Sequence, residues 1–286
     1  MIRDITLGQF FPGFSVLHKL DPRTKILSSV LFIVATFMAN NLTSFLALSL
    51  VTVLLVSVSR INARVILKSL KPLLFILIFT SLINVFLTVG EGEPLLAFHF
   101  IKIYKEGIIR AVFMTVRVIL LIIGTSMLLT YTTSPISLTD GIESLLKPLK
   151  LIKVPVHSFA MMMSIALRFI PTLVEETEKI MNAQKSRGAD FSNGGLVKRA
   201  KALIPILVPL FVSSFKRADE LAVAMECRCY RGDKNRTKLV KLEYKTRDIL
   251  WLVGFVLFLT VIILGRILPY EFGIDNLFYN IFFYKI

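Results

Sequence analysis

Residues 183–190 read AQKSRGAD and residues 224–233 read AMECRCYRGD, and each segment closes a long helical pattern within residues 156–233. In both segments small residues flank an arginine, and a glycine follows it. Glycine readily adopts the left-handed conformation that ends helices, and a cation suits the negative end of the helix dipole. We therefore expect two long helices, with Arg187 and Arg228 in or near their last turns.

Both helical patterns change from apolar to polar residues along their length. The first is apolar around Met161–Ile170, where Arg168 is the only charged residue, and it becomes polar from Glu175 onward. The second is apolar over residues 202–215 and charged after them. A helix with one apolar and one charged half connects two media, so we expect both helices to lie at or dip into the membrane boundary. Bends are expected at the internal prolines, which are Pro171, Pro205 and Pro209.

The composition indicates a membrane protein. Hydrophobic residues make up 55% of the 286 residues, whereas soluble domains contain about 45–50%. The net charge of +15 is therefore assigned to loops at a membrane surface, and no nucleic-acid partner is expected. The two cysteines, Cys227 and Cys229, imply no disulfide framework, and two ligands without a third do not make a zinc site. We expect no metal and no cofactor.

Five apolar runs predict transmembrane helices. Some are shorter than the ~20 residues that span a bilayer, so we expect Lys25 and Arg60 to extend toward the surface at their ends. Asp21 followed by Pro22 predicts an N-cap and the start of the first helix. The chain is thus expected to be an all-α, polytopic membrane protein. The predicted spans are Ile26–Ala39, Leu42–Val58, Pro72–Val89, Gly107–Tyr131 and Ile249–Leu264.

Basic residues predict the orientation. Residues 132–248 hold 20 Lys+Arg against 12 Asp+Glu, residues 1–25 and 59–71 hold four Lys+Arg each, and residues 90–106 hold two. Since Lys and Arg concentrate on the cytoplasmic side, we expect a cytoplasmic N-terminus and an external C-terminus in the cell membrane. Residues 1–25 lack an apolar core, so no cleavable signal peptide is expected.

The predicted organisation has three parts. Residues 1–131 form an amphipathic N-terminal segment and four transmembrane helices. Residues 132–248 form a cytoplasmic helical coupling module that contains the two long helices. Residues 249–286 form the last transmembrane helix and an external tail.

Two arginines fall inside the fourth predicted span. Arg110 and Arg117 are seven positions apart, which places them on one face of a helix. Arginines inside membrane segments are functional candidates by default. The alternative for Arg110 is that its side chain extends to the surface.

The chain resembles the transmembrane (T) component family of energy-coupling factor transporters, the vitamin and metal importers of the ABC class, over nearly its whole length. The resemblance rests on LGQFFPG at residues 7–13, LDPRTK at residues 20–25 and the two arginine signatures, SRG at 186–188 and CRC at 227–229. The second signature departs from the family pattern, in which Ala and Gly usually flank the arginine. The N-terminal segment is most similar to the shared type that serves several substrate-binding proteins.

The resemblance implies partners and site residues. Two cytoplasmic ATPases would each receive one arginine in a groove, so the implied coupling residues are Ser186, Arg187, Gly188, Cys227, Arg228 and Cys229. An interchangeable substrate-binding S component in the bilayer would pack on an apolar seat, for which the candidates are Met161, Met162, Met163, Ile165, Phe169 and Ile170. Methionine suits surfaces that accept several partners, although plain core packing is the alternative.

Other functions fit the sequence less well. A T component dedicated to cobalt, nickel or biotin is the main alternative. A self-contained secondary transporter should show repeated halves around a midplane site, whereas the predicted spans contain no Asp or Glu and no visible repeat. An intramembrane protease would need a catalytic constellation, and neither a paired His nor Gly-x-Ser-x-Gly occurs. The chain also has no Gly-x-x-x-x-Gly-Lys-Ser/Thr motif, so we expect it to lack ATPase activity.

Overall fold

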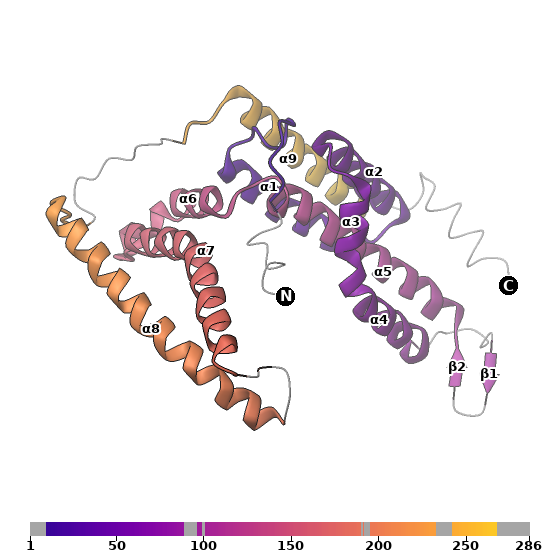
Figure 1. The fold of residues 1–286 in the computed structure, drawn as a ribbon. Helices are drawn as coiled ribbons and strands as arrows, with labels where there is room; N and C mark the ends of the chain where they lie inside the picture. The colour runs from indigo at the N-terminus through magenta and orange to yellow at the C-terminus, as the bar shows by residue number, and fades with distance from the viewer. Residues whose placement is uncertain are drawn as a thin grey trace. The chain divides into compact units, whose positions relative to one another are not determined.

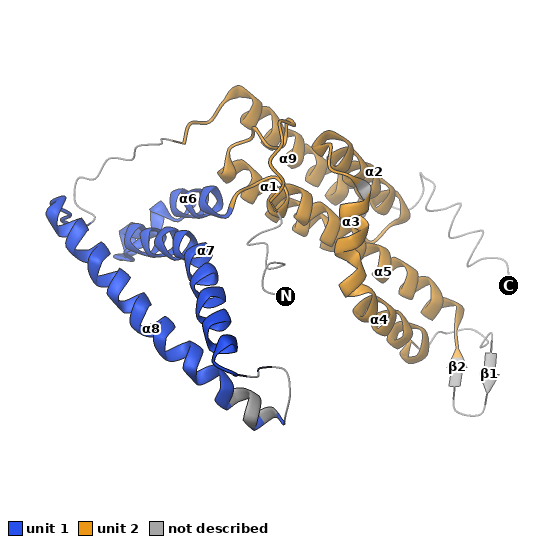
Figure 2. Cartoon of the chain, viewed as in Figure 1, with its two compact units in different colours: residues 1–9, 135–241 blue, residues 10–134, 242–286 orange. Residues whose placement is uncertain are grey.

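The computed structural model describes residues 10–88, 96–98, 101–189, 191, 195–232 and 242–267. The chain forms two compact units, coloured separately in Figure 2. Unit 1 comprises residues 1–9 and 135–241, and unit 2 comprises residues 10–134 and 242–286. Residues 7–9 of the predicted 7–13 motif, Asp190 and Asp233 lie outside the described residues.

Unit 2 is mainly helical, which confirms the predicted fold class (Figure 1). A short antiparallel hairpin, with Leu96 opposite Ile103, is the only β structure in the described ranges. The π-helical turn η2 continues α5. The elements are α1 (Pro22–Met38), α2 (Leu42–Ser59), α3 (Ala63–Leu70), the 3₁₀ turn η1 (Lys71–Leu73), α4 (Leu74–Leu87), β1 (Leu96–Phe98), β2 (Ile101–Ile103), α5 (Lys105–Thr125), η2 (Ser126–Thr130) and α9 (Thr246–Ile267).

Unit 1 contains the two predicted long helices. Both continue through their internal prolines, and Figure 1 shows α7 changing direction part-way along its length. A proline removes one helical hydrogen bond and crowds the preceding turn, so a change of direction in α7 fits the position of Pro171. The elements are α6 (Pro135–Leu145), the 3₁₀ turn η3 (Lys147–Ile152), α7 (Val156–Ser186) and α8 (Leu196–Cys227).

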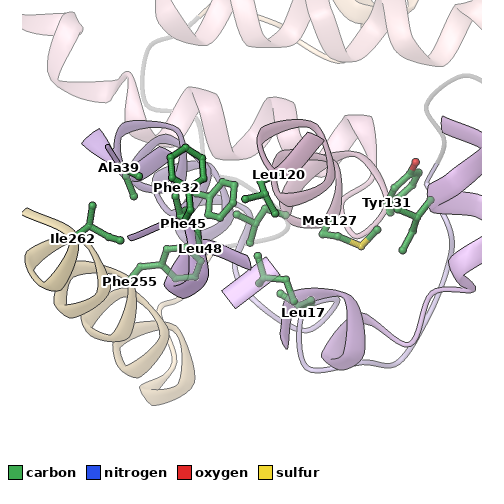
Figure 3. Close-up of a cluster of buried hydrophobic side chains, with 14 of the residues drawn as sticks. Leu17, Phe32, Ala39, Phe45, Leu48, Leu120, Met127, Tyr131, Phe255 and Ile262 are labelled. Atoms are coloured by element: carbon green, nitrogen blue, oxygen red, sulfur yellow. The ribbon is translucent and has the colours of Figure 1, made fainter. Parts of the chain in front are cut away.

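Helix α1 is central to unit 2, because it packs on both α5 and α9. Its Phe32 is fully buried and belongs to the apolar cluster drawn in Figure 3. A Cβ atom at Gly124 of α5 would lie 2.2 Å from Phe32 Cε1, so only glycine permits this approach. Small polar residues also line α1, as is common where membrane helices pack closely; the buried ones are Thr24, Ser28, Ser29 and Thr36.

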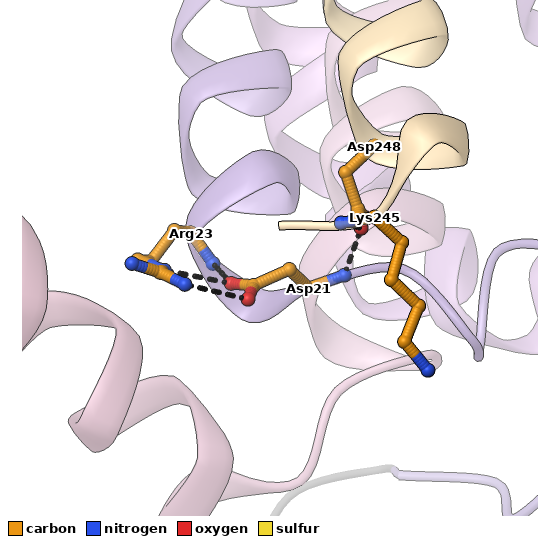
Figure 4. A network of polar contacts seen from close by, with 4 residues as sticks. All are labelled: Asp21, Arg23, Lys245 and Asp248. Carbon is orange, nitrogen blue, oxygen red and sulfur yellow. Dashed lines mark hydrogen bonds and ion pairs between the residues drawn. The ribbon is translucent and has the colours of Figure 1, made fainter. Parts of the chain in front are cut away.

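Asp21 and Asp248 join the starts of α1 and α9, as Figure 4 shows. Asp21 is the N-cap of α1, as predicted, and its carboxylate accepts the Arg23 backbone N–H at 2.8 Å. The same carboxylate pairs with the Arg23 guanidinium at 3.0 Å. The Asp21 backbone N–H donates to Asp248 Oδ1 at 2.8 Å, and Asp248 Oδ2 accepts the Lys245 N–H at 2.9 Å.

The prediction that Lys25 extends to the membrane surface is wrong. Its side chain is 2% exposed, and its Nζ donates to the Thr132 carbonyl at 2.8 Å. Burial lowers the pKa of Lys25 to about 8, although the carboxylates of Asp21 and Asp248 favour the charged form. The sequence suggested otherwise because a lysine before an apolar run usually faces water, whereas this one joins α1 to the segment after η2.

Among the described residues, five helices are long and apolar enough to cross a membrane: Leu42–Ser59, Arg64–Leu87, Lys105–Thr130, Val156–Ser186 and Thr246–Gly265. The number agrees with the prediction, but one member differs. The run predicted at Ile26–Ala39 belongs to the 17-residue α1, which is only about 26 Å long at ~1.5 Å per residue. Helix α7, predicted to lie at the membrane boundary, meets the length and composition requirements instead.

Replacing Asp248 by Ala should destabilise unit 2. Two backbone N–H groups would lose their acceptor, and a buried donor left unpaired costs about 1–3 kcal/mol. We expect a lower melting temperature for the purified full-length protein in detergent. Glu243→Ala is the matched control, since Glu243 is exposed on the same approach to α9. Equal melting temperatures for the two variants would contradict a structural role for Asp248.

Candidate functional site: two arginine-capped helices

The helices α7 and α8 end in the same backbone geometry. Arg187 is the C-cap of α7 with φ −87° and ψ 6°, and Arg228 is the C-cap of α8 with φ −88° and ψ 13°. The residue that follows each arginine is left-handed, Gly188 with φ 86° and Cys229 with φ 58°. The two ends are therefore matched in conformation as well as in sequence.

Hydrogen bonds of the Schellman type close both ends. After α7, the N–H of Gly188 donates to Lys185 O at 2.9 Å and that of Ala189 donates to Gln184 O at 3.0 Å. After α8, the N–H of Cys229 donates to Glu226 O at 2.8 Å and that of Tyr230 donates to Met225 O at 3.0 Å. These pairs satisfy carbonyls that a helix end otherwise leaves free, so each arginine sits on an ordered end.

The second helix stop differs from the prediction. The glycine that follows Arg228 in sequence is Gly232, but α8 stops at Cys227 and the left-handed residue that closes it is Cys229. Gly188 ends α7 as expected. A non-glycine residue in the left-handed region is disfavoured by roughly 1–2 kcal/mol, and the two Schellman hydrogen bonds offset that strain. The position of glycine in the sequence therefore does not predict where α8 ends.

Both arginines present their side chains to solvent. Arg187, Arg228 and the four flanking residues are all exposed, and Cys227 and Cys229 are free thiols. In the described part of the chain neither guanidinium forms a hydrogen bond or an ion pair. Ser186 is occupied with its own helix, since its Oγ donates to Asn182 O at 3.1 Å. The N–H donors of each guanidinium are therefore available for hydrogen bonds to another molecule.

A polar contact holds α7 against α8. The Glu176 carboxylate of α7 accepts the Ser213 hydroxyl at 2.6 Å and the Arg217 guanidinium at 2.6 Å. The pair is partly exposed, with 23% of the Glu176 side chain and 40% of the Arg217 side chain accessible. A charge-assisted contact at this level of exposure contributes modestly to stability, but it fixes where the two helices meet.

The two arginine ends lie far apart. Near the end of α7, Gln184 Nε2 donates to the Pro205 carbonyl in the first half of α8, at 3.4 Å. Residues 205–228 of α8 then rise about 1.5 Å each, or roughly 35 Å in all. The arrangement therefore presents two separate cationic ends and not one combined pocket. No group of three or more His, Cys, Asp and Glu side chains among the described residues is arranged to hold a metal ion.

Known proteins are similar in sequence to this chain. A family model described as CbiQ, a cobalt transport protein, matches residues 13–239. The energy-coupling factor transporter transmembrane protein EcfT of Clostridium kluyveri is 52% identical over 93% of this chain and 98% of its own. The EcfT proteins of Ruminiclostridium cellulolyticum and Bacillus subtilis are 53% and 47% identical, over 92% and 90% of this chain and 98% and 96% of theirs. The chain belongs to the EcfT family.

As an EcfT protein, the chain is the transmembrane component of an energy-coupling factor transporter. The predicted apolar seat on α7 is only partly accessible. Met162 and Met163 are 57% and 43% exposed, whereas the remaining members, Met161, Ile165, Phe169 and Ile170, are half-buried.

An apolar surface larger than the predicted seat on α7 lies on α8 of EcfT. The sequence did not predict the residues of this surface as a site. Its members recur every three or four positions, which places them on one helix face. Ile206, between them in sequence, is buried instead. The apolar run 202–215 was a visible signal, but only the structure shows which residues remain uncovered. The exposed residues of this α8 stripe are Leu203, Ile204, Leu207, Val208, Phe211, Val212 and Phe215.

Replacing Cys229 by Gly should stabilise the end of α8, because glycine adopts positive φ without the Cβ clash. We expect amide exchange at Tyr230, which donates the outer Schellman bond, to slow by roughly fivefold or more, corresponding to about 1 kcal/mol. Cys227→Gly is the matched control. Position 227 is helical, so glycine there should accelerate exchange. The same direction of change in both variants would contradict the assigned cap.

Exchanging the charges of Glu176 and Arg217 should preserve the crossing of α7 and α8, whereas Arg217→Glu alone should place two carboxylates together. Spin labels at Lys185→Cys and the native Cys227, in a Cys229→Ser background, report the distance between the helix ends. We expect the distance distribution to broaden in Arg217→Glu and to narrow again in Glu176→Arg/Arg217→Glu. A double variant as broad as the single one would show that the pair does not set the crossing.

Proposed function

We propose that this EcfT chain couples ATP hydrolysis by two cytoplasmic ATPase subunits to the movement of a substrate-binding S component. The single observation that carries the proposal is the matched pair of exposed arginine caps on α7 and α8. A helix end with an unpaired guanidinium is suited to enter an acidic groove. A charge-assisted contact of this kind contributes about 1.5–3 kcal/mol.

The distance between the caps supports one ATPase per arginine. Two arginines that lie roughly 35 Å apart along α8 cannot both enter the same ATPase groove. The contact of Glu176 with Ser213 and Arg217 links the helices, so force applied at one end reaches the other. Movement of two ATPases toward each other would thereby change the position of the helices.

The S component would pack on the apolar surfaces of the same helices. Met162 and Met163 of α7 and the α8 stripe are uncovered, and large exposed apolar patches mark interaction sites. Methionine adapts to differently shaped partners, which supports a seat for interchangeable S components. The substrate pocket then belongs to the S component, and ATP hydrolysis belongs to partner chains, since this sequence has no phosphate-binding loop.

A vitamin or micronutrient importer with a shared T component is the form of transporter we favour. The relatives at about half identity carry a general energy-coupling factor name. The cobalt transport description of the family model keeps a dedicated metal transporter as the second candidate. Co-purification separates the two, because a shared component captures several different S components and a dedicated one captures a single kind.

We infer that the N-terminus and the α7–α8 region are cytoplasmic and that the C-terminus is external. The basic-residue distribution supports this orientation. We further propose that the short helix α1 crosses the membrane and that α7 lies at the membrane boundary without crossing it, so five crossings separate the two termini. Its second half carries Glu175, Glu178 and Lys179 in addition to the contact of Glu176 with Arg217.

Cysteine accessibility tests this orientation. With both native cysteines replaced by Ser, an impermeant reagent added outside intact cells should label Gly92→Cys and spare Asn193→Cys. Position 193 follows α7 directly, so its labelling also reports whether α7 crosses. Permeabilised cells provide the control, because both positions should then react. Labelling of 193 but not 92 in intact cells would reverse the orientation.

Charge reversal at the caps tests the coupling function. Arg187→Glu and Arg228→Glu should each weaken capture of the ATPases by about 2–5 kcal/mol, and the double variant should lose both ATPases and uptake. Arg→Lys at either site should have a partial effect, since lysine lacks the planar fork. The readouts are pull-down of the ATPases and substrate uptake in a reconstituted system.

Matched controls exist beside each cap. Lys185→Glu and Arg231→Glu reverse exposed charges two and three residues away without altering either capping arginine, so they should retain the ATPases. A double cap variant that keeps both ATPases and transports normally would refute the proposal.

A further inference from the structure

Arg110 and Arg117 of α5 line one cavity within unit 2. The cavity has a volume of about 470 Å³, and its polar lining consists of Asn40, Glu106, Arg110 and Arg117. Phe45 and Phe113 are among its apolar walls. The two arginines thus share a face, as their spacing predicted, and that face borders a hollow. Neither arginine has a part in the proposed coupling of ATPases.

Arg117 is held in place from one side only. Its Nη2 donates to the Ala39 carbonyl at 2.6 Å and to Asn40 Oδ1 at 3.3 Å, so it caps the C-terminal end of α1. Its guanidinium also lies 5.4 Å from the centre of the Phe45 ring. Nη1 contacts only the Met114 sulfur, at 3.9 Å. Nε is buried and has no acceptor among the described residues, so an oriented donor remains unused.

Arg110 supplies a second cation at the open side of the same cavity. It is exposed and, in the described ranges, has no hydrogen bond or ion pair. Glu106 lies one turn before it, so the cavity carries two positive charges and one negative charge. The surplus of one positive charge matches a single phosphodiester, which carries one negative charge.

Both arginines lie in the first half of the candidate span that contains α5. The candidate span starts at Lys105, and a rise of ~1.5 Å per residue places Arg110 about 8 Å and Arg117 about 18 Å from that start. Arginines at such depth are expensive unless they meet an opposite charge or polar groups. A lipid phosphate drawn in between Arg110 and Arg117 would provide that charge.

An apolar groove continues from the cavity. The groove has a volume of about 310 Å³ and runs along α2 and α5, where Leu46, Val112 and Val116 line it. It shares Phe45, Ile109 and Phe113 with the arginine cavity. A cationic cavity joined to an apolar groove matches a phospholipid, which has a charged headgroup joined to an acyl chain. Inorganic phosphate would fill only the cavity and leave the groove empty.

We propose that the arginine cavity of EcfT binds the phosphodiester headgroup of a membrane phospholipid, with an acyl chain in the groove between α2 and α5. The phosphate oxygens would accept hydrogen bonds from Arg110 and from Nη1 of Arg117. The lipid would thereby neutralise the one surplus positive charge of the cavity and join α5 to the turn between α1 and α2. The site concerns unit 2 and is independent of the arginine caps on unit 1.

Native mass spectrometry of the purified full-length chain in detergent tests the site, with dioleoyl phosphatidylglycerol as the probe. Dioleoylglycerol has the same chains without the phosphate, and inorganic phosphate has the charge without the chains. We expect phosphatidylglycerol to bind at least about tenfold more tightly than either. Equal binding of dioleoylglycerol would overturn the role of the arginines, and equal binding of inorganic phosphate would overturn the lipid assignment.

Two variants locate the binding. Arg110→Gln removes an exposed side chain that forms no hydrogen bond or ion pair with the described residues, and we expect it to weaken phosphatidylglycerol binding about tenfold at unchanged melting temperature. Arg247→Gln removes an exposed arginine at the start of α9 and should leave binding unchanged. Arg117→Lys keeps the charge but not the guanidinium geometry, and should also weaken binding. Equal affinity of the Arg110 and Arg247 variants would refute the proposed site.

Discussion

An α-helix leaves four N–H and four C=O groups without partners at its ends, and a bilayer offers no water to satisfy them. Much of unit 2 follows from this constraint. Asp21 and Asp248 satisfy N–H groups where α1 and α9 begin. At the opposite ends of these helices, Arg117 donates to Ala39 O, and Asn41 Nδ2 donates to Gly265 O at 2.9 Å. Side chains from neighbouring helices therefore close helix ends and join the bundle at the same time.

In unit 1 the backbone groups at the ends of the long helices find their hydrogen-bond partners in a different way. The ends of α7 and α8 are closed by their own backbone in two Schellman motifs, so the capping arginines are not consumed in closing them. These helices also leave apolar side chains uncovered, above all the α8 stripe. The helix ends of unit 2 are thus closed through tertiary contacts, whereas the ends of α7 and α8 in unit 1 leave their arginines available. That contrast is what a subunit needs if one part stays in the bilayer and another meets several partners.

The arginines of the described helices serve different purposes, and their surroundings distinguish them. Arg217 pairs with Glu176 and sets a helix crossing. Arg117 caps α1 from inside a cavity. Arg187 and Arg228 are exposed on closed helix ends. A guanidinium remains charged in all of these settings, so the accessible donors, and not the residue type, determine whether it stabilises the fold or binds another molecule.

The sequence by itself determined the helical class, the two arginine-ended helices, the N-cap at Asp21 and the pairing of Arg110 with Arg117 on one face. These features depend on residues within a few positions of one another, through helical periodicity and capping. Only the tertiary structure decided that Lys25 is buried, that Cys229 takes the place of a glycine, and that α8 carries the larger apolar surface. It also brought Asp21 to Asp248, across 227 positions of sequence. Burial and such contacts depend on which helices pack together, and an apolar pattern specifies a face without specifying what covers it.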